Sequence, residues 1–251
     1  MQRAHPAYRI VCDQPGVGMR TRHVRHFRAL HERCHARSGE ATTMDFTKSH
    51  RVLQDRFDTR RLADRLASVA GDDVSSYRAF IEARDMFFLA TADANGQPQC
   101  SHKGGDPGFV RVVDAHTIAF PSYDGNGMFL STGNITENAA VGLLFIDWST
   151  GSRLRLTGSA SIDADDPLMS VYAGATLVVR IRLSAVFPNC RRYVHTHGED
   201  GRTRRSVFVP VEGETPPVPD WKRDEWFDGT LAAGDPALDP TRPSAPSIPR
   251  F

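Results

Sequence analysis

Apolar and polar residues alternate in a series of short segments between residues 87 and 187, with the two-residue period of β-strands. Turn-forming residues separate these segments, and the pair Asn95-Gly96, which favours a tight hairpin, follows the first of them. The pattern predicts strands at 87–93, 97–102, 109–114, 117–122, 141–147, 153–163 and 175–187, and a further edge strand at 206–211.

Three hairpins followed by one long strand predict the fold class. Between residues 86 and 122 the strands follow one another too closely to leave room for a helix of useful length, which disfavours a parallel α/β sheet. An antiparallel sheet of about six strands that curls into a barrel satisfies the pattern best. We therefore expect a mainly β protein with a few flanking helices.

Helical spacing marks the segments beside the strands. Apolar residues recur at helical intervals within 58–70, and a second helix is expected over 72–84. Asn134, with Glu137 three residues later, resembles the capping box at the start of another helix. Shorter helical turns are predicted at 126–131 and 168–172.

Composition narrows the class of protein. The chain of 251 residues is 40% apolar and 24% charged, and its formal net charge of +1 gives no general case for binding nucleic acid or acidic membranes. Four cysteines without C-x-x-C spacing are expected to be reduced thiols of a cytoplasmic protein. No apolar run reaches the roughly 18–20 residues that would span a bilayer.

The two ends of the chain differ in composition from its middle. Residues 1–43 contain eight arginines, five histidines, no lysine and three acids, without a periodic apolar face. This composition favours a basic disordered extension; a nucleic-acid-binding arm and an arginine-rich transit peptide are the alternatives. Residues 44–228 are expected to form the domain, and 229–251, rich in Pro, Ala, Gly and Asp, a disordered tail.

A glycine-rich basic segment, SHKGG, follows the second predicted strand and is the main candidate for ligand binding. His102 and Lys103 supply cationic donors. Gly104 and Gly105 would let backbone N–H groups approach a phosphate closely. The segment therefore predicts a site for a phosphorylated small molecule.

Strand alternation groups further polar side chains. Gln99 and Ser101 share a face with Lys103, because alternate residues of a strand point the same way. Arg153 and Arg155 likewise share one face of a later strand. Two guanidinium groups suit a phosphate or a planar polar ring, and the alternative is a pair of solvated arginines.

The loop PSYDGNGM is another candidate for ligand binding. It places Ser122, Asn126 and Gly127 before an expected helix start, which favours an anion, although such loops also occur simply because the chain turns.

Three potential metal ligands lie further on, at Cys190, His195 and His197. Structural zinc sites have four ligands, so no metal site is predicted.

Residues from about 77 to 190 resemble the FMN-binding split barrels related to pyridoxamine 5'-phosphate oxidase. The resemblance is carried by FFLATADANGQPQCSHKGGDPGFVRV, TIAFPSYDGNGMFLSTGNITENAAVGLLFID and RLRLTGSASI, and more loosely by AVFPNCRRY and PPVPDWKR. It implies a six-stranded antiparallel split β-barrel with FMN at a homodimer interface. It further implies an FMN-dependent oxidoreductase that acts on a small-molecule substrate, with NAD(P)H as a candidate electron donor.

The resemblance also implies which residues contact the cofactor, although no catalytic residue is assigned. Met128 stands where the oxidases usually have a basic residue, so the phosphate would rely on Lys103, His102 or an arginine. Two alternatives keep the fold: a flavin-binding or flavin-storage protein without turnover, and a barrel that binds deazaflavin or haem. The implied cofactor-binding residues are Gln99, Cys100, Ser101, His102, Lys103, Pro121, Ser122, Asn126, Gly127, Arg153 and Arg155.

Overall fold

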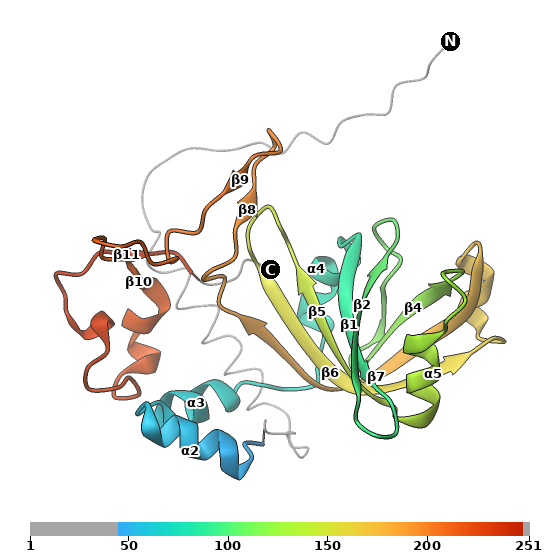
Figure 1. Ribbon diagram of the computed structural model, residues 1–251, viewed down its shortest axis with the longest axis horizontal. Coiled ribbons are helices and arrows are strands. Elements are labelled where there is room, and N and C mark those ends of the chain that lie inside the picture. The colour runs from blue at the N-terminus through green and yellow to red at the C-terminus, as the bar shows by residue number, and fades with distance from the viewer. Residues whose placement is uncertain (1–44, 248–251) are drawn as a thin grey trace.

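One curved antiparallel sheet dominates the computed structural model, which describes residues 45–247 (Figure 1). The extension predicted at 1–43 and the last four residues lie outside the described part. The seven strands of the sheet stand in the order β2-β1-β5-β6-β7-β4-β3. Their bounds are β1 Met86–Ala92, β2 Pro98–Gly104, β3 Arg111–Asp114, β4 Thr117–Tyr123, β5 Ala140–Ile146, β6 Arg153–Asp163 and β7 Ala175–Asn189.

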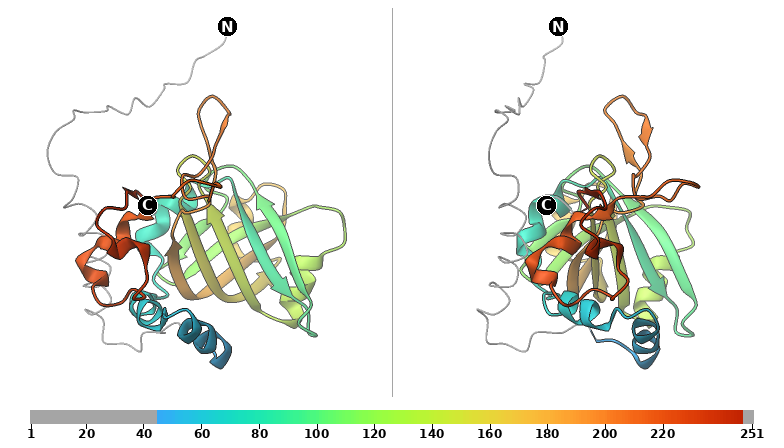
Figure 2. Two further views of the ribbon diagram at one scale, coloured as in Figure 1. Left: turned by 60° about the vertical axis from the view of Figure 1, so that its left-hand side comes forward. Right: turned by 90° about the vertical axis from the view of Figure 1, so that its left-hand side faces the viewer.

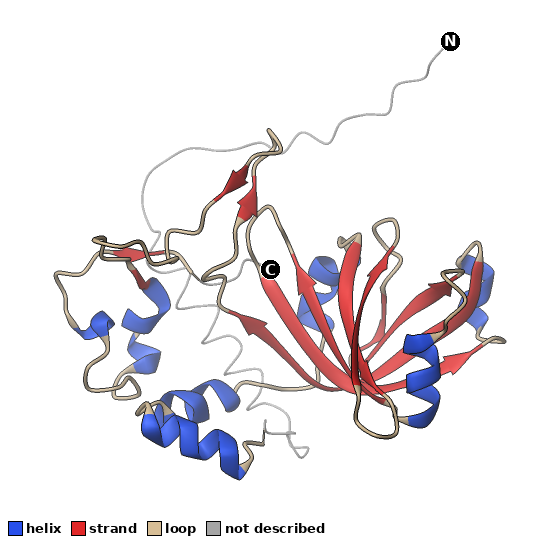
Figure 3. Cartoon of the chain, viewed as in Figure 1, coloured by secondary structure: helices blue, strands red, loops and turns tan. Residues whose placement is uncertain are grey.

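Short helices and minor strands surround this sheet (Figure 3). No helix in the described part of the chain is long and apolar enough to cross a membrane. The α-helices are α2 Lys48–Arg56, α3 Arg60–Ala67, α4 Arg78–Glu82 and α5 Leu130–Glu137. The minor strands are β8 Thr196–His197, β9 Thr203–Arg204, β10 Val218–Pro219 and β11 Ser244–Ala245, and 3-10 helices span Ser75–Tyr77, Pro167–Val171, Asp220–Arg223, Glu225–Phe227 and Pro236–Leu238.

The core fills the concave side of the sheet, as the alternating pattern predicts. Phe87 is fully buried, and its ring centroid lies 5.0 Å from those of both Phe120 and Phe145. Leu154 and Leu156 of β6 are also fully buried. Aromatic rings at this spacing bury much apolar area and hold the strands in one register.

A bulge lies in β7 where it pairs with β6, with Ser184 as the extra residue. The pairing register shifts between Thr157 and Gly158. A Cβ at Gly158 would overlap the carbonyl oxygen of Arg182 on β7, so only glycine fits without a backbone shift. The bulge increases the local twist and helps the sheet to curl.

The mainly β antiparallel class is confirmed, with differences in detail. The sheet has seven strands where a six-stranded barrel was expected. The edge strand predicted at 206–211 is wrong, because that segment turns, with the N–H of Val209 bonded to the carbonyl of Ser206. Asn134 lies inside α5, where its Nδ2 donates to Thr91 Oγ1 at 3.0 Å, and the helix begins after the left-handed Phe129.

Two helices and the C-terminal segment form a separate layer beside the sheet (Figure 2), here called the peripheral layer: α2, α3 and residues 218–247. Its apolar cluster joins Leu62 of α3 to Val218, Leu231 and Ala237. Residues 229–247, expected to be a disordered tail, thus pack against α3 in the structure. Their apolar residues are too sparse to form a periodic pattern, which is why the sequence did not indicate this packing.

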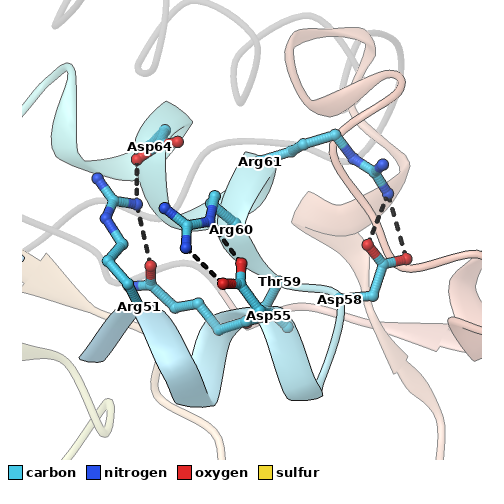
Figure 4. A network of polar contacts seen from close by, with 8 residues as sticks. Arg51, Asp55, Asp58, Thr59, Arg60, Arg61 and Asp64 are labelled. Atoms are coloured by element: carbon cyan, nitrogen blue, oxygen red, sulfur yellow. Dashed lines mark hydrogen bonds and ion pairs between the residues drawn. The ribbon is translucent and has the colours of Figure 1, made fainter. Parts of the chain in front are cut away.

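Ion pairs stabilise the hairpin of α2 and α3 (Figure 4). Arg51 Nη1 contacts Asp64 Oδ1 at 2.6 Å, and Arg60 binds both carboxylate oxygens of Asp55. Helix α2 was not predicted and buries none of its residues. Exposed ion pairs of this kind contribute little each, about 0.2–1 kcal/mol.

Candidate functional site

A cavity of about 730 Å³ opens between strands β1, β2 and β4 and helix α5. Its inner wall is apolar, and its polar groups come from the ends of the strands and from the first turn of the helix. The lining residues are Asp85, Met86, Leu89, His102, Lys103, Gly104, Gly105, Asp106, Phe120, Pro121, Ser122, Tyr123, Asp124, Gly125, Ser131, Thr132, Ile135 and Val179.

Lys103 is the principal cation of this cavity. Strand β2 carries it to the cavity wall, where Nζ donates to Ser131 Oγ at 3.1 Å. Ser131 Oγ also lies 3.0 Å from Ser101 Oγ. None of the ion pairs within residues 45–247 involves Lys103. Burial lowers the pKa of its amino group, because the charged form loses water without gaining an anion.

Helix α5 adds hydroxyl groups and a favourable dipole beside Lys103. Ser131 and Thr132, in its first turn, are both buried and line the cavity. The preceding Phe129 gives no side-chain cap, so the first N–H groups of the helix are not capped from that position. The N-terminus of a helix carries a partial positive charge, and together with Lys103 it favours an anion at this wall.

The two glycines of SHKGG allow neighbouring side chains to pack closely against the backbone. The N–H of Gly105 donates to the carbonyl of Asp85 at 2.9 Å, so it is not free for a ligand. A Cβ at Gly105 would come within 2.8 Å of the Phe109 ring, and one at Gly104 within 2.8 Å of His102 Cε1. The interpretation of these glycines as open phosphate-binding backbone is therefore wrong for Gly105, and both have a steric explanation.

Carboxylates occupy the exposed side of the cavity. Asp85, Asp106 and Asp124 all line it, and all three are exposed. The buried wall with Lys103 and the hydroxyl groups is thus electrostatically different from the mouth. An anionic group is favoured beside Lys103 and disfavoured at the mouth.

Four of the sequence-predicted cofactor residues line the cavity: His102, Lys103, Pro121 and Ser122. Ser101 joins them through its contact with Ser131. The other six lie outside the lining: Gln99, Cys100, Asn126, Gly127, Arg153 and Arg155.

Local contacts explain the positions of these outlying residues. The side chain of Asn126 stabilises a turn of its own loop, because its Oδ1 accepts from the N–H of Met128, two residues later, at 3.1 Å. Arg153 and Arg155 begin β6, at the edge next to the end of β7. Within one chain the structure therefore separates the arginines from Lys103.

Sequence reasoning missed the residues of α5 and the carboxylates. Ser131 and Thr132 were assigned to a turn or left out, although a pair of hydroxyl residues at a helix start is a recognisable anion-binding signal. Asp85 precedes β1 and carried no motif. Its role at the cavity depends on how the ends of β1 and β2 meet, which is a tertiary feature.

The described residues contain no group of three or more His, Cys, Asp or Glu side chains that could hold a metal ion. The ring of His197 packs edge-on against Trp148, with the centroids 6.0 Å apart. Cys190 Sγ lies 3.3 Å from the carbonyl oxygen of Ser247. These side chains have structural contacts of their own.

Comparison with known families finds a match to the barrel. Residues 75–190 match the family model of pyridoxamine 5'-phosphate oxidase. This segment contains all seven strands of the main sheet and the cavity wall with Lys103. The resemblance inferred from the sequence is thus confirmed over these residues.

Solved structures with a similar barrel come from several bacteria. HupZ of Group A Streptococcus is 21% identical, with 45% of this chain and 90% of that chain covered and a TM-score of 0.37. The heme storage protein HutZ of Vibrio cholerae is 19% identical, covering 45% and 91%, with a TM-score of 0.34. An FMN-binding protein of Syntrophomonas wolfei is 13% identical, covering 56% and 95%, with a TM-score of 0.34. No curated protein sequence matches the chain.

Proposed function

We propose that the protein binds FMN in the Lys103 cavity and acts as an FMN-dependent oxidoreductase on a small-molecule substrate. The observation that carries this proposal is the half-buried Lys103, which donates to Ser131 Oγ at 3.1 Å and has no carboxylate partner among the ion pairs of residues 45–247. An anion placed there would compensate the buried charge. The phosphate of FMN supplies such an anion on an otherwise largely apolar molecule.

The residues present fit this cofactor in charge, size and polarity. Ligand cavities commonly measure about 300–1,000 Å³, and this one measures about 730 Å³. Lys103, Ser131 and Thr132 would hold the phosphate, and the apolar Leu89 and Phe120 would exclude water from the inner wall. The isoalloxazine ring of FMN supplies hydride-transfer chemistry when bound. The chain itself would bind and orient the cofactor and exclude water from it.

An absorbance spectrum of the purified protein tests the choice of cofactor. We expect a yellow protein with a flavin spectrum and FMN released on denaturation. A haem Soret band would support the haem alternative, for which His102 on the cavity wall is the candidate imidazole ligand. A deazaflavin in place of FMN would also contradict the proposal.

Reduction kinetics distinguish an enzyme from a storage protein. We expect NADPH or NADH to bleach the bound flavin, and air to restore its colour over repeated cycles. A flavin that stays oxidised with both donors, and exchanges slowly with free FMN, would favour storage without turnover.

We further propose that the convex face of the sheet pairs with a second copy of the chain. Strand pairing places Phe88 of β1 directly opposite Leu144 of β5 on this face. Both side chains are only half-buried in one chain. Leu143 and Phe145, on either side of Leu144 in β5, are buried in the core. The contribution of β5 to an interface would therefore come mainly from Leu144.

Light scattering tests this assembly. We expect a dimer at micromolar concentration, and a monomer after Leu144→Arg, which would place a charge opposite Phe88. Val113→Arg on the edge strand β3 is the matched control, because Val113 is 41% exposed and lies on another part of the sheet. A monomeric wild-type protein that still binds flavin would contradict the proposal.

A further inference from the structure

Three arginines gather at the end of the sheet that is formed by the start of β6 and the end of β7. Arg153 and Arg155 share one face of β6, opposite Asn189 and Phe187 of β7. Arg192 follows β7 by three residues. No acidic side chain is paired with any of them among the ion pairs within residues 45–247.

The three guanidinium groups are close enough to affect one another. Burial is the largest cause that lowers the pKa of the Arg153 guanidinium. The positive charges of Arg155 and Arg192 lower this pKa further, and the interaction with Cys190 raises it in part. An arginine side chain stays protonated in a protein, so the charge itself remains. The cluster is thus an uncompensated concentration of positive charge.

Two of the arginines have hydrogen-bond donors without acceptors. Nε of Arg153 and Nε of Arg192 are buried and unpartnered. Arg153 also donates through Nη2 to the carbonyl of Cys190, which fixes the position of its fork. Oδ1 of Asn189, opposite Arg153, is a third buried atom without a partner. Buried polar atoms are nearly always hydrogen-bonded in folded proteins, so this group calls for a partner outside the described chain.

Neighbouring aromatic rings hold the other side chains in place. The Arg155 guanidinium lies 5.4 Å from the centroid of the Phe187 ring, and that of Arg192 lies 5.8 Å from the centroid of the Tyr193 ring. Tyr193 has a φ of 66°, a left-handed conformation that is uncommon for a bulky residue. Cation–π contacts leave the N–H edges of a guanidinium free for an anion.

We propose that Arg153, Arg155 and Arg192 form a second anion-binding site, separate from the Lys103 cavity, which receives a phosphate or carboxylate group of a small molecule. The oxygens of such a group can accept from both unpartnered Nε atoms and neutralise part of the cluster. The amide of Asn189 can donate to the same group or accept from a hydroxyl beside it. None of these four residues lines the Lys103 cavity.

Calorimetric titration of the full-length protein tests the site, with inorganic phosphate and succinate as separate probes at constant ionic strength. We expect saturable binding of at least one probe. Arg153→Gln and Arg192→Gln should each weaken it by about tenfold or more, the loss that corresponds to one charge-assisted hydrogen bond. Tighter binding of phosphate would assign the site to a phosphate ester, and tighter binding of succinate to a carboxylate.

Arg182→Gln is the matched control, since it removes the same charge from an exposed position on β7. It should change the affinity by less than about twofold, because a solvated charge contributes little. An equal loss in Arg182→Gln would mean general electrostatic attraction and would overturn the site.

Other outcomes would overturn the site as well. Undiminished phosphate binding in the Arg153→Gln/Arg192→Gln double variant would place the anion elsewhere, for example at Lys103. No saturable binding of either probe to the wild-type protein would also overturn it. If Arg153→Gln does not fold, as judged by circular dichroism, Arg192→Gln on the segment after β7 decides the outcome alone.

Discussion

The barrel and the peripheral layer are stabilised in different ways. In the barrel, seven paired strands enclose a continuous apolar core in which Phe87 and its aromatic neighbours are fully buried. The peripheral layer has a smaller set of buried apolar residues, which includes Trp221 and Phe227, and arginines of α3 bind backbone carbonyls far away in the sequence. Arg61 Nη2 donates to the carbonyl of Leu231 at 3.1 Å, and Arg65 to that of Trp226. The layer therefore depends on a small core together with a few directional contacts.

This difference implies different stabilities. The hydrophobic effect contributes in proportion to the apolar area that is buried, about 25 cal/mol per Å². The layer has only two small clusters, Leu62 with three partners and Phe227 with Trp221 and Trp226, so it gains less than the barrel. We expect the peripheral layer to open locally while the barrel remains folded, since regions with few buried apolar contacts open first.

The largest effect is expected in the barrel core. Phe87→Ala should lower the free energy of unfolding by about 3–5 kcal/mol, because it removes a ring that packs against three others. Urea denaturation measures the loss. Phe57→Ala is the control: Phe57 follows α2 in the peripheral layer, is 62% exposed, and should give a change within about 0.5 kcal/mol. Similar losses for both variants would show that the two regions do not differ as described.

A smaller effect is expected for cofactor binding by the barrel. Lys103→Ala removes a charge-assisted contact to phosphate of about 1.5–3 kcal/mol and should weaken FMN binding roughly ten- to a hundredfold. Fluorescence titration with FMN and riboflavin measures it, and riboflavin, which lacks the phosphate, should lose much less. Equal losses for the two ligands would mean that Lys103 contacts the ring or supports the fold.

The peripheral layer should respond only locally to the loss of an arginine. Arg65→Ala removes the contact to the Trp226 carbonyl and a cation–π contact at 5.4 Å, with an expected local cost of roughly 1–2 kcal/mol. Hydrogen exchange of residues 218–247 should accelerate, while the urea midpoint of the barrel stays unchanged. Arg56→Ala, on the exposed end of α2, is the control. A fall in the barrel midpoint with Arg65→Ala would indicate one cooperative unit.

The contrast between the regions also explains what the sequence could predict. Strand alternation is a local signal, so all seven strands of the main sheet were located, and β6 shows it clearly with Leu154 and Leu156 inside and Arg155 outside. The contacts of Arg61 and Arg65 join residues 170 and 161 positions apart, and no local pattern records them. The folded 229–247 segment was missed for this reason.

The candidate site was predictable only in part for a related reason. Lys103 and Ser122 carry the signal of a polar residue at a strand end, and both line the cavity. Ser131 belongs to a helix whose start depends on the left-handed Phe129, which propensity does not indicate. Arg153 and Arg155 have the right chemistry for an anion, but the position of β6 in the strand order places them away from Lys103.

The smallest effect is expected from an ion pair at the rim of the barrel, in which Asp166 is buried and Arg180 is partly exposed, and it should depend on pH. Arg180 Nη2 donates to Asp166 Oδ1 at 3.0 Å, and this hydrogen bond is the main cause that lowers the pKa of the Asp166 carboxyl below its ordinary value. A carboxyl with a depressed folded-state pKa stabilises the fold above its unfolded pKa of about 3.9, and this stabilisation is lost as the pH falls through the folded value. Asp166→Asn should therefore reduce stability at pH 7 and flatten the acid limb of a thermal-melting profile below about pH 4. Arg180→Gln should flatten it in part, because the N–H of Leu168 still donates to Asp166, and the double variant should match Asp166→Asn. An acid limb that Arg180→Gln leaves unchanged would show that the pair with Arg180 is not the main cause of the lowered pKa of Asp166.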